Sequence, residues 1–481
     1  MPNTESSKGP SKRAATIQTP VSDLLDGILF WFFVLGLAWS PFWLGAHAPI
    51  AWGINAFLFS TLVIIHELSV ILLRRSHAVG LRQITTPAVL FFIVLIWIGL
   101  QNATWTPAVT HHPIWELAGS VLGQHLPASI SVNRDLTELA LIRLVTAASV
   151  FWLSLQLCRD PKRAYKLVQM ISFICIAYAA YGLIAYVLMP GHTLWFENPS
   201  AKGYVTSTFY NKNSFGTYAG IGLVVTCAIA LRYFRDEALK AGVPFKYRLA
   251  SIIETSGKAG ALKLGGVFII AVALVATASR GAMFATLFGL FVFGLLTTQS
   301  KKQRNDQRIT IVIGALLLAA TFVAFGDELL GRVSELGVVD GTRLAISTIT
   351  LGSILNSPLL GFGDGTFVDV FPMFRNLSVA IDGRWEMAHN SYVEAFQGLG
   401  VIAGSMLIAS IVLLTFKCLN GTKTRQANLM LPRLATSISL LVGIHSLVDF
   451  SLQIQAVALT FMAILGTGVA QSMSSKISTV G

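Results

Sequence analysis

The chain has 481 residues, of which 54% are hydrophobic and only 12% are Asp, Glu, Lys or Arg. Soluble domains carry about 25% charged residues. This composition, with a mean hydropathy of +0.67, therefore excludes an ordinary soluble enzyme and indicates an integral membrane protein. A formal net charge of +12 would suggest nucleic acid as a partner of a soluble protein. In a membrane protein the same excess marks the cytoplasmic flanks of the spans, and no nucleic acid partner is expected.

The first segment is polar and rich in Ser, Thr and Lys. It lacks the short apolar core and the small-residue cleavage site of a signal peptide. We therefore expect 1–26 to be a disordered cytoplasmic tail and the first span to be an uncleaved anchor. A second cytoplasmic tail is expected at 473–481, so the polytopic membrane domain covers 27–472.

The chain then contains twelve apolar stretches, close to the roughly 20 residues that cross a hydrocarbon core. In chain order we predict spans at 27–45, 49–73, 85–101, 137–157, 167–189, 213–231, 264–279, 281–298, 309–326, 392–416, 434–449 and 453–471. The run 264–298 is interrupted only by Ser279, Arg280 and Gly281, and we divide it into two helices. The predicted fold class is an all-α integral membrane protein of about twelve helices.

The basic residues orient these spans. With the N-terminus in the cytoplasm, 26 of the 35 Lys and Arg residues fall in cytoplasmic segments and 8 fall on the opposite side. This bias follows the positive-inside rule. A single helix at 264–298 would reverse the orientation of every later span, and the bias would then be lost in that part of the chain. Both termini are therefore predicted to be cytoplasmic.

Three longer segments lie on the opposite side, at about 102–135, 190–212 and 327–391. The last is the loop between helices 9 and 10, and long loops without function are uncommon. Within it, 342–355 suits a helix along the membrane surface, with one face made by Leu344, Thr348, Leu351 and Leu355. The stretch 356–358 should end this helix, and a glycine-rich turn follows.

Charged and polar groups at the edge of a membrane are the first functional candidates. Arg280 lies in a tight outer hairpin between Ser279 and Gly281. Its guanidinium could clamp a diphosphate bidentately, or it could be a structural arginine that reaches the interface. His389 and Asn390 open the tenth span. They could handle the proton of a sugar hydroxyl, or they could simply begin the helix.

The stretch 207–216 ends the second outer loop and opens the sixth span. Asn211, Lys212 and Asn213 supply groups that suit a saccharide or a phosphate. The same stretch equally suits a helix N-terminus with Asn213 or Ser214 as its cap, where backbone amides favour an anion.

Arg143 and Arg343 are each either ligand arginines or structural ones paired with an acid, such as Asp340 for the second. His445 and Asp449 lie one turn apart at the outer end of the eleventh span and are better explained as a structural pair. The sequence has no HExxH, DxD or Walker pattern, so neither a metal nor a cofactor is expected.

In this order, these pieces resemble the O-antigen ligase and polysaccharide polymerase family. The matching stretches are Ser207–Tyr218, Ala278–Ala282, Gly341–Arg343, Ser357–Thr366, Ala388–Glu394, Gly398–Ile402 and His445–Asp449. The core of the resemblance is 265–410, which includes the loop 327–391, and the plan of spans extends it over nearly the whole chain. One departure is that many relatives have Asn-Pro-Asn where this chain has Asn-Lys-Asn, at 211–213.

The resemblance implies a multi-pass glycosyltransferase of the bacterial inner membrane, with a lateral cavity under a long periplasmic loop. Its donor would be a glycan carried on undecaprenyl diphosphate. A ligase would transfer this glycan to a lipid A-core sugar, and a polymerase would transfer it to another glycan; we favour the ligase. The other partners implied are membrane lipids.

Carried over to this sequence, Arg280 would neutralise the departing diphosphate and His389 would orient or deprotonate the acceptor hydroxyl. Further candidates for diphosphate or glycan binding are Arg343, Lys212, Asn211, Asn213, Asn390 and Arg143. The rival from another class is a lipid-linked glycan flippase or a secondary transporter, since twelve spans also fit that plan. Transporters bind near the bilayer midplane, whereas the polar groups here gather at one face.

Overall fold

The structure, a computed structural model, describes residues 20–240, 257–297, 340–379, 384–425 and 428–473. These ranges are built of helices, and their one sheet is a hairpin of β1 (His192–Thr193) and β2 (Phe196–Glu197). The expected all-α membrane class is confirmed. The predicted span 309–326 lies outside the described residues.

Within these ranges, ten helices are long and apolar enough to cross a membrane. They are α1 (Pro20–Trp39), α2 (Pro49–Leu72), α3 (Thr85–Asn102), α5 (Arg134–Leu157), α6 (Pro161–Leu188), α7 (Lys212–Lys240), α9 (Gly257–Ala276), α10 (Arg280–Thr297), α15 (Ser391–Thr424) and α17 (Gln455–Ser472). A shorter apolar helix, α16 (Met430–His445), has 16 residues. It occupies the place of the predicted span 434–449.

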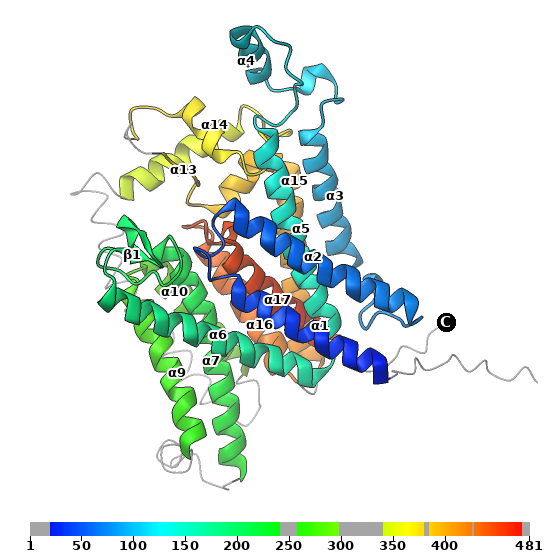
Figure 1. Cartoon of the computed structure of the whole chain (residues 1–481), viewed down its shortest axis with the longest axis vertical. Helices are drawn as coiled ribbons and strands as arrows, with labels where there is room; N and C mark the ends of the chain where they lie inside the picture. Colours follow the sequence, from blue (N-terminus) through cyan, green and yellow to red (C-terminus); the bar gives the residue numbers. More distant parts are fainter. Residues whose placement is uncertain (1–19, 241–256, 298–339, 380–383, 426–427, 474–481) are drawn as a thin grey trace, which may run out of the picture.

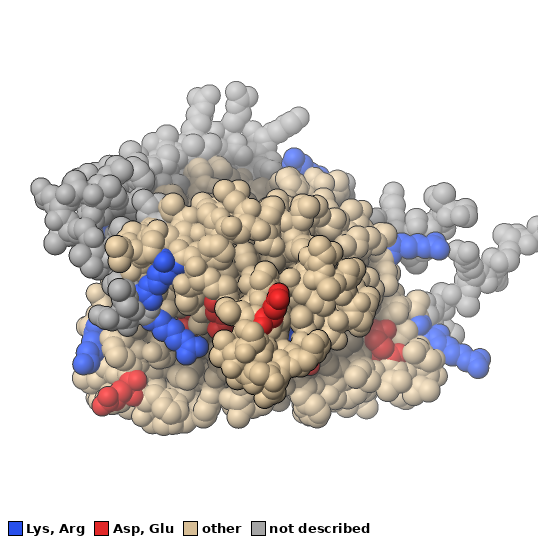
Figure 2. All heavy atoms as spheres, turned by 90° about the horizontal axis from the view of Figure 1, so that it is seen from above, with Lys and Arg blue, Asp and Glu red and all other residues tan. Residues whose placement is uncertain are grey.

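α17 lies in the middle of the bundle (Figure 1), and α7 and α17 are the most buried of the ten long helices. In their apolar windows 89% and 83% of the residues are buried, against 39% or less in the other eight helices. α17 packs on α5 and α16, and α7 packs on α6, α9 and α10. The outer helices expose apolar side chains such as Phe57 and Phe92, and most of the surface in Figure 2 is neither acidic nor basic. Such a surface suits contact with lipid.

The first helix begins earlier than the sequence predicted. α1 starts at Pro20, so the expectation that the disordered tail extends to residue 26 is wrong; residues 1–19 lie outside the description. The added turn contains Asp26, whose carboxylate lies 2.9 Å from Arg75 and 3.3 Å from Arg163. These two ion pairs stabilise the helix at its polar start, before the apolar stretch of the span.

The division of 264–298 into two helices is confirmed. α9 ends at Ala276 and α10 begins at Arg280. Ala278 has a φ of +49°, which a continuous helix cannot accommodate. The backbone N–H of Val205 bonds the Ala276 carbonyl at 3.0 Å, which ties this turn to the segment before α7.

Short elements lie at the ends of the spans. They are η1 (Leu81–Gln83), η2 (Ala108–Thr110), α4 (Ile114–Leu122), η3 (Pro199–Ala201), α13 (Asp340–Ile354), α14 (Phe367–Phe374) and η6 (Ser451–Gln453). α4, α13, α14 and the β1–β2 hairpin lie along the top and left of Figure 1. They come from the three segments that the charge pattern assigned to one side.

The helix predicted at 342–355 is confirmed as α13, and its place along the membrane surface stays a prediction. Its buried side chains include Ile346, Thr350 and Ser353, and it packs on α14 and α15. Two residues of the predicted apolar face, Leu351 and Leu355, are exposed. An exposed apolar face on a helix beside the bundle suits contact with the lipid surface.

α15 is broken at Gly400, which has φ +77° and ψ 164°. The glycine-rich turn after α13 pairs with the broken helix. The Phe362 N–H donates to the Gln397 carbonyl and the Gly363 N–H to the Gly398 carbonyl, each at 3.0 Å. A break at membrane depth requires such partners, because lipid offers none. Gly361, Gly363 and Gly365 all have positive φ, as the expected turn requires.

We expect Gly400→Ala to lower the free energy of unfolding by about 3 kcal/mol or more. Its φ/ψ region is essentially restricted to glycine, and occupying it costs about 1–3 kcal/mol. In addition, a Cβ would lie 2.3 Å from the Leu359 carbonyl oxygen. Thermal unfolding of the purified protein in detergent measures the change. Gly53→Ala in α2 is the control, since a Cβ there meets nothing within 4 Å. Equal stability of the two variants would contradict the role of the break.

Candidate active site

Arg280 is the first residue of α10 and is half-buried. The turn before it is held by a bond from the Ser279 N–H to Thr277 Oγ1 at 3.1 Å. The next residue, Gly281, packs on the imidazole of His445, where an added Cβ would lie 3.1 Å from Nε2. The missing side chain at Gly281 therefore lets the start of α10 approach the end of α16 closely.

α7 begins beside this turn, at Lys212. Asn211 caps it, because its Oδ1 accepts the Asn213 N–H at 2.8 Å. The prediction that Asn213 or Ser214 is the cap is wrong, since both lie inside the first turn. Lys212 Nζ lies 3.1 Å from the ring centroid of Tyr204, a cation–π contact.

Glycines bring α7 against α10. A Cβ at Gly216 would lie 2.8 Å from Ala282 Cβ, and one at Gly220 would lie 2.2 Å from Thr286 Oγ1. Small residues at such a contact allow two membrane helices to approach closely. The contact places 211–213 at the same end of the bundle as Arg280.

His445 lies in a buried polar cluster at this end. Its Nδ1 is 2.7 Å from Thr217 Oγ1 and 3.4 Å from Ser451 Oγ. Thr217 Oγ1 also donates to Ser451 Oγ at 2.9 Å, and Ser451 Oγ donates to Asp449 Oδ1 at 3.0 Å. All four side chains belong to residues that are 2% exposed or less. The cluster joins α7 to the segment that links α16 and α17.

The expected arrangement of His445 and Asp449 on one helix is wrong. α16 ends at His445, and Asp449 lies in the turn that follows. Asp449 Oδ1 accepts the N–H of Phe450 at 2.8 Å, a local side-chain-to-backbone bond that competes with helix continuation. The two residues are connected through Ser451, and their structural role stays a prediction.

His389 stands on the other side of the same segment. Its φ is +54°, a conformation that residues other than glycine rarely adopt. Its ring meets Phe450 edge to face with centroids 4.9 Å apart, and Trp385 at 6.0 Å. Asn390 is the N-cap of α15, since its Oδ1 accepts two backbone N–H groups of the first turn at 3.0 and 3.2 Å. These contacts fix the position of the imidazole.

The segment 445–451 therefore connects the two main candidates. Gly281, next to Arg280, packs on one end of it through His445. His389 packs on the other end through Phe450. The N-termini of α7, α10 and α15 all lie around this segment. Helix N-termini carry partial positive charge, so the region favours an anion.

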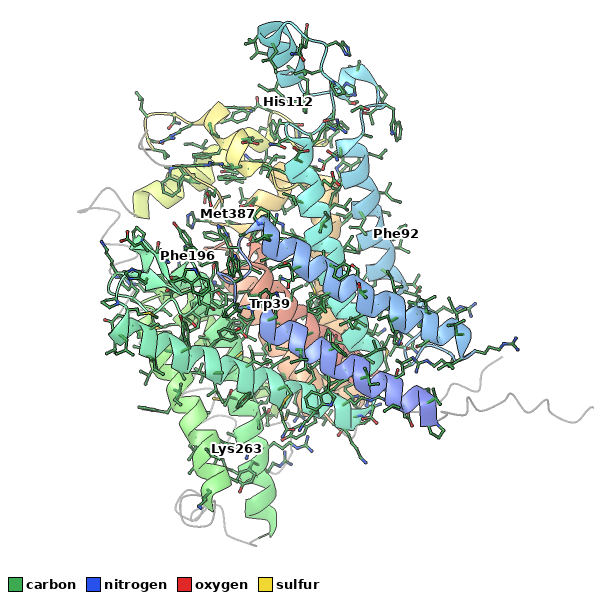
Figure 3. All side chains as sticks on the ribbon, viewed as in Figure 1. Trp39, Phe92, His112, Phe196, Lys263 and Met387 are labelled. Carbon is green, nitrogen blue, oxygen red and sulfur yellow. The ribbon has the colours of Figure 1, made fainter. Side chains whose placement is uncertain are left out.

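Sequence reasoning missed three side chains that meet at the outer ends of the helices. His47 Nε2 lies 3.4 Å from Glu386 Oε2, and its ring stacks on Tyr210 at a centroid distance of 5.9 Å. The hydrogen bond to His47 holds the pKa of Glu386 below its ordinary value. The three residues come from the segments before α2, α7 and α15, so no sequence spacing links them. Figure 3 shows Met387, next to Glu386, between α14 and the helix ends below it.

Arg143 is half-buried and contacts residues from other segments. Its guanidinium lies 4.4 Å from the Trp52 ring centroid and 3.5 Å from the Gln453 carbonyl oxygen. Asp364 and Glu394 are its electrostatic partners. Burial raises the pKa of Asp364, and the charge of Arg143 opposes that rise. These contacts favour the structural interpretation of Arg143.

Arg143, Asp364 and Glu394 form a group that we call the Arg143 cluster. Glu394 connects this cluster to the backbone beside His389, the candidate general base. Its Oε2 accepts the Ala388 N–H at 2.8 Å. Ser391 Oγ donates to Gln453 Oε1, also at 2.8 Å. The cluster therefore fixes the backbone on both sides of His389.

Arg343 lies on α13, but its side chain is outside what the structure describes, so its role as a ligand stays a prediction. In the described part of the chain, no three His, Cys, Asp or Glu side chains are grouped as metal ligands. The expectation that no metal takes part also stays a prediction.

Comparison with known proteins agrees with the resemblance seen in the motifs. Residues 265–408 match the family described as O-Antigen ligase. This segment includes the α9–α10 turn with Arg280, and it also includes His389. No curated protein matches the chain.

We expect Thr217→Val to lower the free energy of unfolding by about 1–3 kcal/mol, the cost of leaving a buried polar group without its partner. The change removes the hydroxyl next to His445 Nδ1 at nearly constant volume, and Thr217→Ser should restore most of the loss. Thermal unfolding compares the variants with Thr436→Val. Thr436 is equally buried, but its hydroxyl bonds the Pro432 carbonyl of its own helix. A loss in Thr436→Val as large as in Thr217→Val would contradict a special role for the cluster.

Proposed function

The chain carries a domain of the O-antigen ligase family at 265–408, and from this premise we propose that it transfers a glycan from undecaprenyl diphosphate to a sugar hydroxyl. The placement of Arg280 and His389 around one short segment, 445–451, is the observation that carries this proposal. The reaction takes place at the periplasmic face of the bacterial inner membrane. The acceptor sugar hydroxyl attacks the anomeric carbon, a new glycosidic bond forms, and the bond from that carbon to the diphosphate breaks.

Arg280 acts on the leaving group. Negative charge builds on the diphosphate oxygen as the bond to the anomeric carbon breaks. A guanidinium is always charged and binds phosphate oxygens bidentately. In a site with little water, a preoriented cation stabilises this developing charge more strongly than it would in water. The neighbouring helix N-termini add partial positive charge of the same sign.

His389 acts on the acceptor. A neutral imidazole can accept the proton of the attacking hydroxyl, or orient that hydroxyl by a hydrogen bond. The contacts with Phe450 and Trp385 support a fixed ring position, and general base catalysis requires a fixed distance. The strained backbone at His389 is of the kind that collects at functional sites.

The remaining candidates take secondary roles. Lys212 and Asn213 stay candidates for glycan or phosphate contacts, because they open α7 at the same end as Arg280. Asn211 and Asn390 cap their helices, and thereby fix where α7 and α15 begin. Arg343 stays a candidate for the diphosphate.

We expect Arg280→Ala to lower transfer by about a hundredfold or more, as removal of one electrostatic stabiliser does in other enzymes. Arg280→Lys should recover part of the rate, since it keeps the charge but loses bidentate binding. His389→Ala should lower transfer by a factor on the order of 10²–10⁴, the usual contribution of acid–base catalysis. The measurement is glycan transfer by the purified protein reconstituted with lipid-diphosphate-linked glycan, in the presence of EDTA.

Lys202→Ala is the matched control, because Lys202 is an exposed cation in the outer segment before α7. It should transfer at the wild-type rate. Full activity in both Arg280→Ala and His389→Ala would refute the proposal.

The same assay separates ligase from polymerase. Glycan on added lipid A-core identifies a ligase, which we favour. Growth of the lipid-linked chain without an added acceptor identifies a polymerase instead. Absence of product under both conditions would instead favour a lipid-linked glycan flippase or a secondary transporter.

A further inference from the structure

A cavity of about 360 Å³ lies at the end of the bundle away from Arg280. α10 begins at Arg280 and ends at Thr297, and Thr297 lines this cavity. A helix of 18 residues is about 27 Å long at 1.5 Å per residue. The cavity is therefore separated from the candidate active site by most of the thickness of a membrane.

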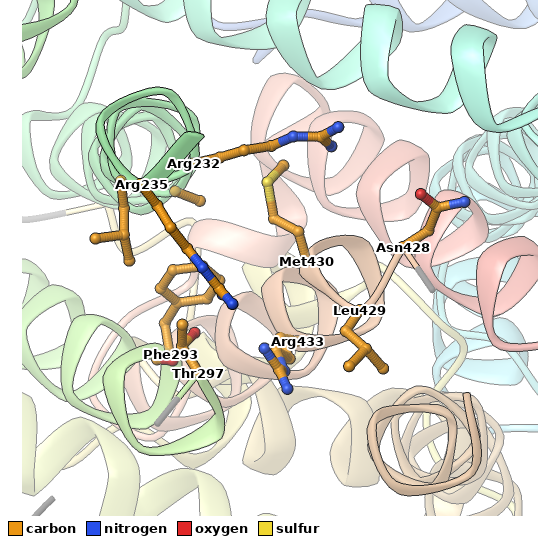
Figure 4. Close-up of a pocket in the computed structure, with 10 residues that line it drawn as sticks. Arg232, Arg235, Phe293, Thr297, Asn428, Leu429, Met430 and Arg433 are labelled. Carbon is orange, nitrogen blue, oxygen red and sulfur yellow. Dashed lines mark hydrogen bonds between the residues drawn. The ribbon is translucent and has the colours of Figure 1, made fainter. Parts of the chain in front are cut away.

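Three arginines from two helices line the cavity (Figure 4). Arg232 and Arg235 come from the last part of α7, and Arg433 comes from the first turn of α16. In Figure 4 the side chains of Arg235 and Arg433 extend into the space between α7, α10 and α16. None of the described residues that line the cavity is acidic.

A second cavity, of about 230 Å³, adjoins the first. Arg232, Asn428 and Met430 line both cavities, and Lys162 adds another cation to the second. The guanidinium of Arg232 lies over the ring of Tyr165 at 4.3 Å. Two adjacent cavities thus share a basic wall.

Two arginines of this wall, Arg235 and Arg433, form an unfavourable pair. Arg235 and Arg433 are close enough for their like charges to repel. Arg433 Nε is buried, and no hydrogen-bond acceptor meets it among the described residues. A buried N–H of a cation without an acceptor is costly. An anion with several oxygens would relieve both costs at once.

Apart from Thr297 and Asn428, the remaining lining is apolar. It includes Ala228, Leu231, Phe293 and Leu429. A free ion would leave these side chains uncovered, whereas a lipid offers a charged head and an apolar body. Basic pockets between membrane helices on the positively charged side are known to suit anionic lipid headgroups. The volume is also within the range of ligand sites.

We propose that the cavity bounded by Arg232, Arg235 and Arg433 binds the phosphate of an anionic phospholipid. In the proposed orientation this is the cytoplasmic leaflet, so the site is separate from the periplasmic donor. The Arg433 side chain supplies its buried Nε–H to a phosphate oxygen, and Arg235 neutralises the same group. The apolar wall covers the first part of the lipid chains. A lipid bound there would hold α7, α10 and α16 together below the active site.

The test uses the full-length protein, purified and delipidated in a neutral detergent. Phosphatidylglycerol, phosphatidylcholine or inorganic phosphate is added, and bound molecules are measured by native mass spectrometry. The wild type should bind phosphatidylglycerol in preference to phosphatidylcholine. R235Q/R433Q should bind it about tenfold or more weakly, because one charge-assisted hydrogen bond contributes on the order of tenfold in affinity. R235K/R433K keeps the charge and should show a smaller loss.

R82Q/K423Q is the matched control, since it removes two exposed cations at the same end of the bundle. It should bind phosphatidylglycerol as the wild type does. Gel filtration checks that each variant is folded. If R235Q/R433Q is not folded, R235K/R433K still tests the proposal. Equal losses in R235Q/R433Q and the control would overturn the proposal, and so would equal binding of both lipids. Displacement of phosphatidylglycerol by inorganic phosphate would overturn the lipid as the source and assign the site to a soluble phosphate.

Discussion

The segment from His445 to Ser451 carries the contacts on which the candidate site depends. α7 reaches it through Thr217, α10 through Gly281, and the start of α15 through His389 on Phe450. Its polar side chains are buried, and burial favours hydrogen bonds to partners inside the protein. These contacts fix the relative positions of three helix N-termini, and they bring the start of α10, where Arg280 lies, and the imidazole of His389 to the same short segment. The chemistry we propose follows from this placement.

A second constraint comes from the membrane itself. Lipid cannot satisfy a backbone group, yet α15 is broken at Gly400. The carbonyls released near the break accept bonds from the glycine-rich turn, and Trp97 Nε1 donates to the Leu399 carbonyl at 2.9 Å. The loop that contains α13 and α14 is thus attached to α15 by backbone bonds. Through the Arg143 cluster, this attachment extends to the residues on both sides of His389.

Hydropathy and charge predicted the helical class, most of the spans and the division at Arg280, because burial in lipid demands long apolar runs. The motifs also identified Arg280 and His389 as the main candidate catalytic residues. What the sequence could not supply were contacts between distant segments. Asn213 or Ser214 was predicted as the cap of α7, whereas Asn211 caps it. His445 and Asp449 have helical spacing, although α16 ends at His445. The Gly400 break depends on partners about 40 residues upstream, and the meeting of His47 with Glu386 has no local signal.

The division of roles between Arg280 and His389 is the central claim, and binding of undecaprenyl diphosphate itself tests it most directly. This product carries the diphosphate but no sugar, so it should report on the leaving-group side alone. Its affinity for the purified wild type, Arg280→Ala and His389→Ala would be measured by titration. The account predicts at least about tenfold weaker binding to Arg280→Ala, since a charge-assisted contact is lost, and near wild-type binding to His389→Ala. Unchanged affinity in Arg280→Ala, or an equal loss in His389→Ala, would contradict it.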